Sequence, residues 1–434
     1  MLARRRSISA TRAQQRGASM VFIVIGLTAM LAMAGLALDT GHTMLNKSRL
    51  QNATDAAALA AAKIFDDTKS TALGGVEAAT AFQRNASTTG NSELAAAYAN
   101  GSGTITLTVQ WSATLNPFTP GSPIGPYVRV IASGFIRPTF LLGVAGIANT
   151  TVGATAVAGP SPSINQACNL VPMMVCANTT AGAAANWGYT VNAPTVMKLA
   201  APGGGTVGPG NFQLVQLPGG SGANWVRQNL AGGYGSCNSI GDQLNTQPGD
   251  ETGPVADGID TRFGDYNGNL HGDQALYPPD VITTQQSPAL TVNTSSSGCS
   301  SSSPCIQQGT NGPIITPSNI NLIFNYQTYS AELATPADYT YQPIPTGIGA
   351  FNRRVVSVPI GNCSAGGGGS SSIPILGFGC FFLLQEPTHV GNTDWILGQF
   401  IGTCDVNGTP GPAPSSGPQP YIIQLYRDPT SGDS

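Results

Sequence analysis

Charged residues are scarce in this chain of 434 residues. They make up 9% of the sequence, whereas an ordinary soluble domain has about 25%. The net charge is -3, and half of the Lys and Arg residues lie before position 70. A nucleic-acid-binding surface needs positive charge gathered on one face. The composition therefore excludes nucleic acid as a partner.

Histidine is also rare, and cysteine is missing from the first third of the chain. None of the cysteines forms a C-x-x-C pair, and the three histidines are scattered, so a zinc site is excluded. The eight cysteines are Cys168, Cys176, Cys237, Cys299, Cys305, Cys363, Cys380 and Cys404. An even number of cysteines behind a hydrophobic leader predicts disulfides in an oxidising compartment. Proximity in the sequence favours the pairs Cys168–Cys176 and Cys299–Cys305, although other pairings stay open.

Motifs for catalysis are missing as well. The chain has no G-x-S-x-G, no P-loop and no dinucleotide-binding G-x-G-x-x-G in a βαβ context. Neither an enzymatic activity nor a cofactor nor a small-molecule substrate is therefore expected.

One acidic segment resembles a calcium loop only in part. "DYNGNLHGD" begins as D-x-N-x-N, but Leu270 and Leu276 stand where an EF-hand requires Gly and Glu. A different calcium site remains a weak candidate, and the alternative is a loop of Asx-turns. Its ligands would be Asp257, Asp260, Asp265 and Asp273.

A long apolar run stands near the N-terminus. Gly17 to Leu38 are 22 residues without a charge, preceded by a basic segment, 1–16, with five arginines. About 20 apolar residues in a helix cross a bilayer. Because positive charge stays inside, we expect a single-pass anchor with a cytoplasmic N-terminus and with everything after Asp39 outside the cytoplasm.

A leader of this kind has two other interpretations. "AMA" at Ala32 to Ala34 fits a signal-peptidase site, but the apolar run is longer than the usual h-region of a cleaved signal. A type IV prepilin would have Glu where this chain has Phe22, so processing of that kind is not expected.

Helical periodicity continues beyond the apolar run. An apolar stripe recurs at three- and four-residue spacing, and its small side chains allow another helix to approach closely. The stripe is formed by Leu50, Ala53, Ala57, Ala60, Ala61 and Ile64. The pattern fits either one long stalk or two separate helices.

The N-terminal segment resembles the TadE/TadG-like family of the tight-adherence (Flp) pilus assembly apparatus. The resemblance rests on an R-G-A opening, a G-x-x-x-D end to the apolar span, a basic turn and an alanine-rich helix. These features fall on Arg16 to Ala18, Gly35 and Asp39, Lys47 and Arg49, and Leu50 to Ala62. The resemblance implies an inner-membrane anchor with a periplasmic body and, as partners, the membrane and other pilin-like or pilus-assembly subunits.

The chain departs from one branch of that family. Many TadG-like proteins carry a von Willebrand factor A domain with a D-x-S-x-S metal loop, and this chain has no such loop. It therefore resembles a TadG-like member without that domain.

Past the stalk the sequence predicts strands. Residues 103–111, 126–138 and 151–160 read as strands, and "TFLLGVAGIA" reads as a short helix or a buried strand. These segments complete a pilin-like unit, 39–160. The remainder, 161–434, is rich in strand candidates and loops, among them "FQLVQL", "NINLIFNYQTY", "RRVVSVPI", "ILGFGCFFLLQ" and "TDWILGQFIG". The predicted class is α+β, with a long N-terminal helix, a small antiparallel sheet and a β-rich extracytoplasmic domain.

The function expected from these features is that of a membrane-anchored structural part of a pilus-assembly or secretion apparatus. It would act through helix packing and periplasmic contacts. Two alternatives stay open: a surface adhesin or filament-tip protein, and a secreted hydrolase with a cleaved signal peptide.

Overall fold

The computed structural model describes residues 18–121, 124–162, 164–198, 211–232, 235–249, 251–293, 305–309, 312–315, 323–365, 370–390, 393–402, 404, 408–410 and 420–428. The predicted basic segment, 1–16, lies outside these residues.

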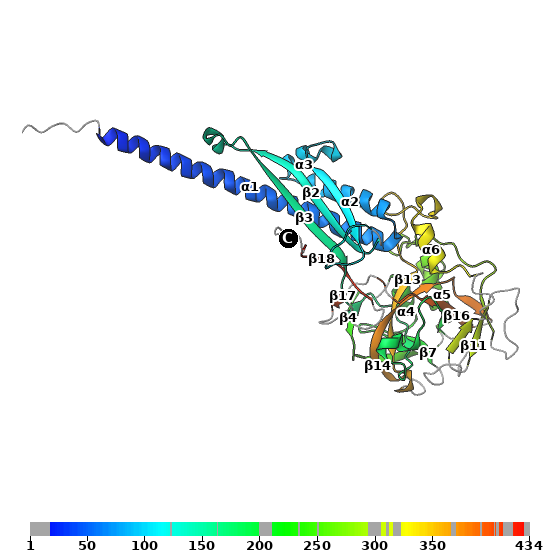
Figure 1. Cartoon of the computed structure of the whole chain (residues 1–434). Helices are drawn as coiled ribbons and strands as arrows, with labels where there is room; N and C mark the ends of the chain where they lie inside the picture. The colour runs from blue at the N-terminus through cyan, green and yellow to red at the C-terminus, as the bar shows by residue number, and fades with distance from the viewer. Residues whose placement is uncertain are drawn as a thin grey trace, which may run out of the picture.

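A single helix, α1 (Ala18–Thr68), forms the stalk of the molecule. Its 51 residues contain no proline and are rich in Ala and Leu, which favour helix. The helix ends where Lys69 adopts a positive φ of 54°. Of the two interpretations of the alanine-rich segment, one continuous helix is correct (Figure 1).

The other α-helices and the strands are distributed over two bodies, a proximal body around α1 and a distal domain. The helices are α2 (Thr71–Ala86), α3 (Ser92–Tyr98), α4 (Ala223–Gly232), α5 (Thr252–Asp260) and α6 (Tyr326–Leu333). The strands of the first half are β1 (Thr106–Ser112), β2 (Tyr127–Pro138), β3 (Asn149–Pro160), β4 (Ile164–Cys168), β5 (Val175–Cys176), β6 (Pro194–Lys198) and β7 (Asn211–Gln216). The later strands are β8 (Cys237–Ser239), β9 (Gln243–Pro248), β10 (Thr291–Asn293), β11 (Cys305–Gly309), β12 (Gly312–Ile315), β13 (Val355–Gly361), β14 (Ser372–Leu383), β15 (Thr388–Val390), β16 (Thr393–Phe400), β17 (Gly408–Pro410) and β18 (Ile423–Tyr426).

The proximal body packs a four-stranded antiparallel sheet, in the order β1-β2-β3-β18, against the second half of α1. Ser70 caps α2 by accepting a hydrogen bond from the Leu73 N–H, so the chain reverses immediately after α1. Gly74 on α2 lies against Trp111 and α1, and a Cβ at this position would stand 2.7 Å from the indole. The missing side chain thus permits close packing of the two helices and β1.

The C-terminal strand returns to this proximal body. β18 pairs with β3, from Ile423 opposite Pro160 to Tyr426 opposite Val157. Beside it Arg129 and Asp428 form a buried ion pair with an N–O distance of 2.7 Å. The distal domain is therefore inserted between β3 and β18, and the predicted division at residue 160 leaves out the last strand.

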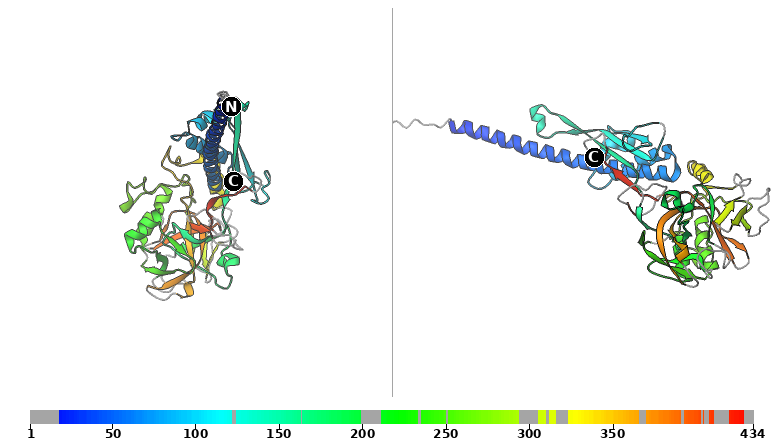
Figure 2. Two further views of the ribbon diagram at one scale, coloured as in Figure 1. Left: turned by 90° about the vertical axis from the view of Figure 1, so that its left-hand side faces the viewer. Right: turned by 60° about the horizontal axis from the view of Figure 1, so that its bottom comes forward.

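The distal domain lies beyond the C-terminal end of α1 (Figure 2). Five strands of its eight-stranded sheet follow the order β15-β16-β14-β13-β5. Of the other three, β6 pairs with β16, β9 pairs with β14, and β7 pairs with β9. Helices α4 and α5 cover one part of its core, and α6 covers another. The predicted plan of a long apolar helix followed by a β-rich part is confirmed.

Two predicted elements differ from the structure. Of "NINLIFNYQTY", the part that the structure describes ends in helix α6, because the Asn325 side chain accepts the Thr328 N–H and caps it. The segment "TFLLGVAGIA" forms neither an α-helix nor a buried strand. It is the exposed tip of the β2–β3 hairpin and contains a short 3-10 turn, Leu142–Ala145.

Candidate functional site

The first half of α1 carries the predicted membrane span. Within the described part of the chain, α1 is long and apolar enough to cross a membrane. From Met20 to Leu38 its large apolar side chains are exposed, whereas Gly35 is buried. Exposed apolar surface on this scale is unusual for a protein in water. Its length and composition fit the predicted transmembrane segment, Gly17 to Leu38, of which Gly17 lies outside the described residues.

The alanine stripe of α1 is an internal contact. Leu50, Ala53, Ala57 and Ala61 have no exposed surface and pack against α2 and the proximal sheet. Ala60 and Ile64, at the edge of the stripe, are partly exposed. The expectation that this stripe contacts other subunits is therefore wrong for its buried members. Small side chains do allow close approach, but the elements that approach belong to the same chain.

Asp39, the first charge after the apolar run, joins α1 to the hairpin tip. Its carboxylate accepts the backbone N–H groups of Phe140, Leu141 and Leu142 at 2.8, 3.0 and 2.7 Å. The hydrogen bond from Leu142, supported by those from Phe140 and Leu141, lowers the pKa of Asp39 below its ordinary value. The carboxylate thus satisfies the free N–H groups at the start of the 3-10 turn.

Gly35 allows the tip to reach the helix. A Cβ on this glycine would stand 2.6 Å from the Leu141 Cβ, closer than two carbon atoms can pack. Gly35 and Asp39 lie one turn apart on α1 and face the same loop. The G-x-x-x-D spacing therefore has a structural role, namely to receive the hairpin tip at the end of the apolar segment.

A polar cluster lies next to the tip on the side away from the apolar run. Glu93 accepts one hydrogen bond from the Asn46 side chain and pairs with Arg137 at 2.6 Å and His42 at 3.0 Å. Partial burial acts to raise the pKa of Glu93, but the hydrogen bonds from Arg137 and Asn46 outweigh it and lower the pKa. The His42 ring also packs edge-on against Phe140. Sequence reasoning missed this cluster, because its members come from α1, α3 and β2.

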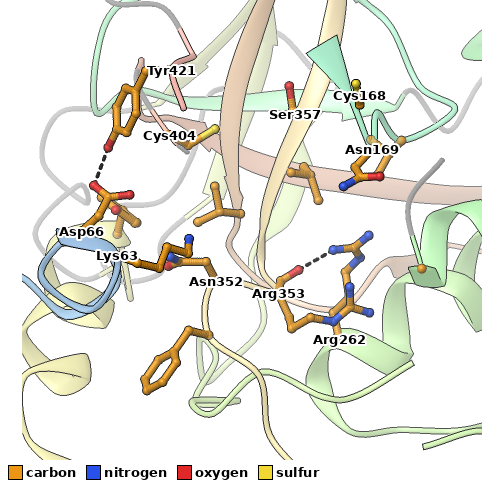
Figure 3. A pocket seen from close by; sticks show the side chains of 16 residues that line it. Lys63, Asp66, Cys168, Asn169, Arg262, Asn352, Arg353, Ser357, Cys404 and Tyr421 are labelled. Carbon is orange, nitrogen blue, oxygen red and sulfur yellow. Dashed lines mark hydrogen bonds between the residues drawn. The ribbon is translucent and has the colours of Figure 1, made fainter. Parts of the chain in front are cut away.

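The C-terminal end of α1 meets the distal domain at a second polar contact. Tyr421 donates to Asp66, and the Asn352 side chain donates to Asp67 at 2.6 Å. A cavity of about 350 Å³ opens here, and its lining includes Lys63, Asp66, Arg262, Arg353 and Tyr421 (Figure 3).

The two arginines of this cavity have structural roles. Arg262 donates from Nε to the Leu230 carbonyl, and Arg353 donates from Nε to the Pro278 carbonyl, each at 2.8 Å. Burial lowers the pKa of both guanidinium groups, and for Arg262 the nearby Arg353 adds to the effect. The arrangement holds loops together at the joint between α1 and the distal domain.

Buried charges also brace the distal core. The guanidinium of Arg354 donates to the carbonyls of Leu383 and Leu384, while Asp280 accepts the Arg354 backbone N–H at 2.9 Å and the Tyr329 hydroxyl at 2.8 Å. Burial raises the pKa of Asp280 and lowers that of Arg354 to about 10. The side chains of Asp280 and Arg354 are thus engaged in hydrogen bonds that stabilise the fold of the distal domain.

The calcium candidates do not converge. Among the residues that the structure describes, no group of three or more His, Cys, Asp or Glu could hold a metal ion. Asp257, on α5, forms an ion pair with Arg227 at 2.8 Å instead. The other weak candidates, Asp260, Asp265 and Asp273, are likewise not gathered into such a group in the described structure, and their use as calcium ligands stays a prediction.

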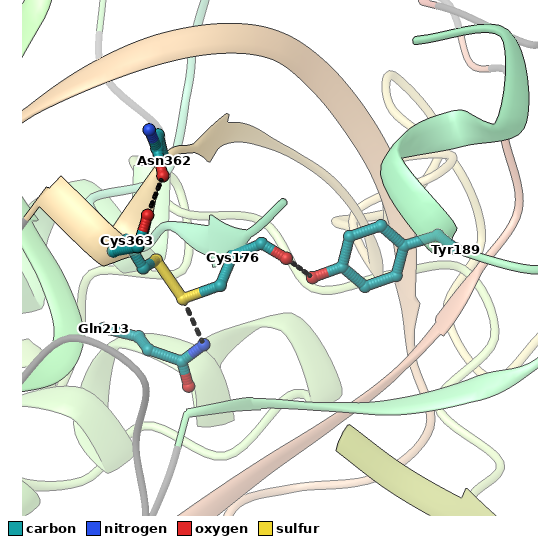
Figure 4. The surroundings of a disulfide bond; sticks show 6 residues. Cys176, Tyr189, Gln213, Asn362 and Cys363 are labelled. Atoms are coloured by element: carbon teal, nitrogen blue, oxygen red, sulfur yellow. Dashed lines mark hydrogen bonds between the residues drawn. A yellow bond between two sulfur atoms is a disulfide. The ribbon is translucent and has the colours of Figure 1, made fainter. Parts of the chain in front are cut away.

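The cysteines pair across strands and not with their nearest neighbours in the sequence. Cys168 bonds to Cys237 because β4 pairs with β8, and Cys176 bonds to Cys363 because β5 runs beside β13 (Figure 4). The predicted pair Cys168–Cys176 is wrong. Cys380 bonds to Cys404. The predicted pair Cys299–Cys305 involves Cys299, which lies outside the described residues.

An apolar, exposed half-helix continuous with a packed half-helix fits a membrane-anchored protein. The family model described as "Putative Flp pilus-assembly TadE/G-like" matches residues 17–63. The resemblance of this segment to the TadE/TadG-like family of the Flp pilus assembly apparatus is thereby confirmed. No curated protein and no solved structure matches the chain.

Proposed function

We propose that this protein is a non-enzymatic, membrane-anchored structural component of an Flp pilus assembly or secretion apparatus. The observation that carries the proposal is the TadE/G-like match, which falls on the exposed apolar half of α1 and on its packed continuation. The match suggests the apparatus, and the exposed half-helix suggests the mode of attachment.

The proposed topology is single-pass, with the N-terminus in the cytoplasm and residues after Asp39 in the periplasm. The five arginines before the span support this orientation. The disulfides Cys168–Cys237, Cys176–Cys363 and Cys380–Cys404 support an oxidising compartment for the distal domain.

The proposed mode of action is scaffolding. The stripe around Ala57 is used within the chain, so contacts with other pilin-like or assembly subunits would involve surfaces that remain exposed. These are the apolar half of α1 in the bilayer and the outer surface of the distal domain. Rigid attachment of the distal domain, through Asp66 and Asp67 at the end of α1, would hold it at a fixed distance from the membrane.

A deletion strain tests the proposal. We expect loss of pili and of surface adherence, with recovery when the full chain is supplied. A matched control replaces residues 1–38 by a cleavable export signal, which delivers the same body without its anchor. This control should fail to restore pili, and a tagged full chain should recover other assembly subunits from detergent extracts. Normal piliation in the deletion strain would refute the proposal.

Two further measurements separate the alternatives. Protease treatment of intact cells should leave a periplasmic protein uncut, whereas a surface adhesin would be cleaved. Sequencing of the mature N-terminus should find the span still attached, whereas a secreted hydrolase released after Ala34 would begin at Gly35.

A further inference from the structure

The tip of the β2–β3 hairpin is an apolar, uncharged and exposed loop. The exposed fraction of the side chain is 67% for Phe140, 49% for Ile147 and 42% for Leu141. The sequence has no charged residue between Arg137 and Lys198. A tip of this kind is costly to keep in water, at about 25 cal/mol for each Å² of apolar surface.

The height of this tip along α1 is fixed. Asp39 binds the backbone of Phe140, Leu141 and Leu142, and Gly35 contacts Leu141. Gly35 precedes Asp39 by four residues, or about 6 Å along a helix. The tip therefore lies level with the last turn of the apolar segment, roughly midway along α1 (Figure 1).

The polarity around the tip changes over a short distance. On the N-terminal side of the Asp39 contact, α1 exposes only apolar or small side chains as far as Met20. On the other side, the cluster of His42, Glu93 and Arg137 lies next to the tip. This change from apolar to charged groups is the pattern of a boundary between a bilayer and water.

We propose that Phe140, Leu141 and Ile147 insert into the interfacial layer of the bilayer that α1 crosses. The occupant of this surface is lipid, at the boundary between headgroups and acyl chains, because the tip continues the apolar surface of the span. The inference rests on the membrane anchoring proposed above. It gives the protein a second point of attachment, which fixes the tilt of α1 and its rotation about the helix axis.

Site-specific labelling of the full chain tests this attachment. In the part of the chain that the structure describes, no cysteine is free, so an introduced cysteine gives a reactive thiol for an environment-sensitive fluorophore, and the unsubstituted chain treated in the same way gives the background labelling. The labelled variants are Phe140→Cys and Ile147→Cys at the tip, Leu31→Cys in the span, and Val76→Cys as a control. Val76 is an exposed apolar residue on α2, so it matches the tip in character but lies outside the proposed contact.

The variants are reconstituted into vesicles of phosphatidylethanolamine and phosphatidylglycerol without other proteins. Labels at 140, 147 and 31 should lose emission to a quencher attached to the lipid chains and resist aqueous iodide. The label at 76 should respond in the opposite way. Two tip positions are used so that a local effect of one substitution does not decide the result.

The outcomes separate the two proposals. If the label at 31 is not quenched from the lipid, the membrane anchor fails and the tip proposal fails with it. If the label at 31 is quenched but those at 140 and 147 behave like the label at 76, the anchor stands and the tip proposal is overturned.

Discussion

Side-chain size on α1 decides how closely the rest of the proximal body approaches the helix. Ala53, Ala57 and Ala61 are fully buried and lie under α2 and the sheet. The stripe could be recognised in the sequence from its spacing. Its partner could not, because a surface that favours close packing looks the same whether the neighbour belongs to the same chain or to another.

Enlarging one of these alanines should destabilise the protein itself. Ala57→Leu should lower the free energy of unfolding by about 1–3 kcal/mol, because a packed core has no space for the added atoms. Chemical unfolding in detergent, followed by circular dichroism, measures the change. The control is Ala72→Leu on α2, an exposed position where the same substitution should change stability little. Equal stability of Ala57→Leu and the control would contradict the internal role of the stripe.

At the scale of the element, the hairpin tip depends on one carboxylate. Hydrogen bonds from the tip lower the pKa of Asp39. A group whose pKa is lowered by folding stabilises the folded state above its unfolded pKa, and this stabilisation is lost as the pH falls through the folded value. The contact should therefore be intact above about pH 4 and weaken in stronger acid. Glu93, with a lowered pKa, should respond in the same direction.

A distance measurement checks this dependence. Spin labels at Thr40→Cys and Ile147→Cys should give a narrow distance distribution at pH 7 and a broad one at pH 2. In the Asp39→Asn background the distribution should be broad at both values, since the amide presents only one acceptor oxygen. A second pair, at Thr40→Cys and Val76→Cys, reports whether the packing of α2 on α1 survives the acid. A narrow tip distance in Asp39→Asn at pH 7 would disprove the role of the carboxylate.

The disulfides also act between elements. Cys176–Cys363 closes a separation of 187 residues, whereas Cys380–Cys404 closes one of 24. A longer closed loop restricts the unfolded chain more. Replacing Cys176 and Cys363 together by serine should therefore lower the melting temperature more than replacing Cys380 and Cys404. Differential scanning calorimetry makes the comparison, and the reverse order would show that local packing outweighs the effect on the unfolded chain.

The sequence patterns predicted where strands and helices form better than they predicted which other parts of the chain those elements contact. The alternation in 103–111, 126–138 and 151–160 predicted β1, β2 and β3, because period-two burial is a local property. The bond from Asp39 to Leu142 joins residues 103 apart, and Cys176 bonds a residue 187 away. Such contacts depend on how strands and helices assemble, and short-range spacing carries no information about them. The same limit explains why Cys168–Cys176 seemed the natural pair.

For the whole molecule, the return of the chain to the proximal sheet is the main organising feature. Asp428, which follows β18, forms a buried ion pair with Arg129 on β2 of the proximal sheet. Breaking a buried pair leaves one charge without compensation. Asp428→Ala should therefore lower the free energy of unfolding of the proximal body by roughly 3–5 kcal/mol.

An exposed ion pair provides the control for that prediction. Arg84 and Glu77 pair on the surface of α2, and Glu77→Ala should cost less than about 1 kcal/mol. Hydrogen exchange of β3 and β18 locates the effect. Slow exchange in these strands of Asp428→Ala, unchanged from the parent protein, would count against a stabilising role for the return.

The inserted position of the distal domain has a mechanical consequence. Its chain leaves from Pro160 at the end of β3 and comes back at Ile423, which pairs with that same residue. Tension that the chain itself carries from the distal domain therefore enters the proximal sheet through two adjacent antiparallel strands, β3 and β18, and pulls both along their length. Loaded in this way, the hydrogen bonds that join β3 to β2 resist together and do not open one after another like a zipper. If the protein works in a pilus apparatus as proposed, a force on the distal domain would reach α1 without first peeling the sheet apart.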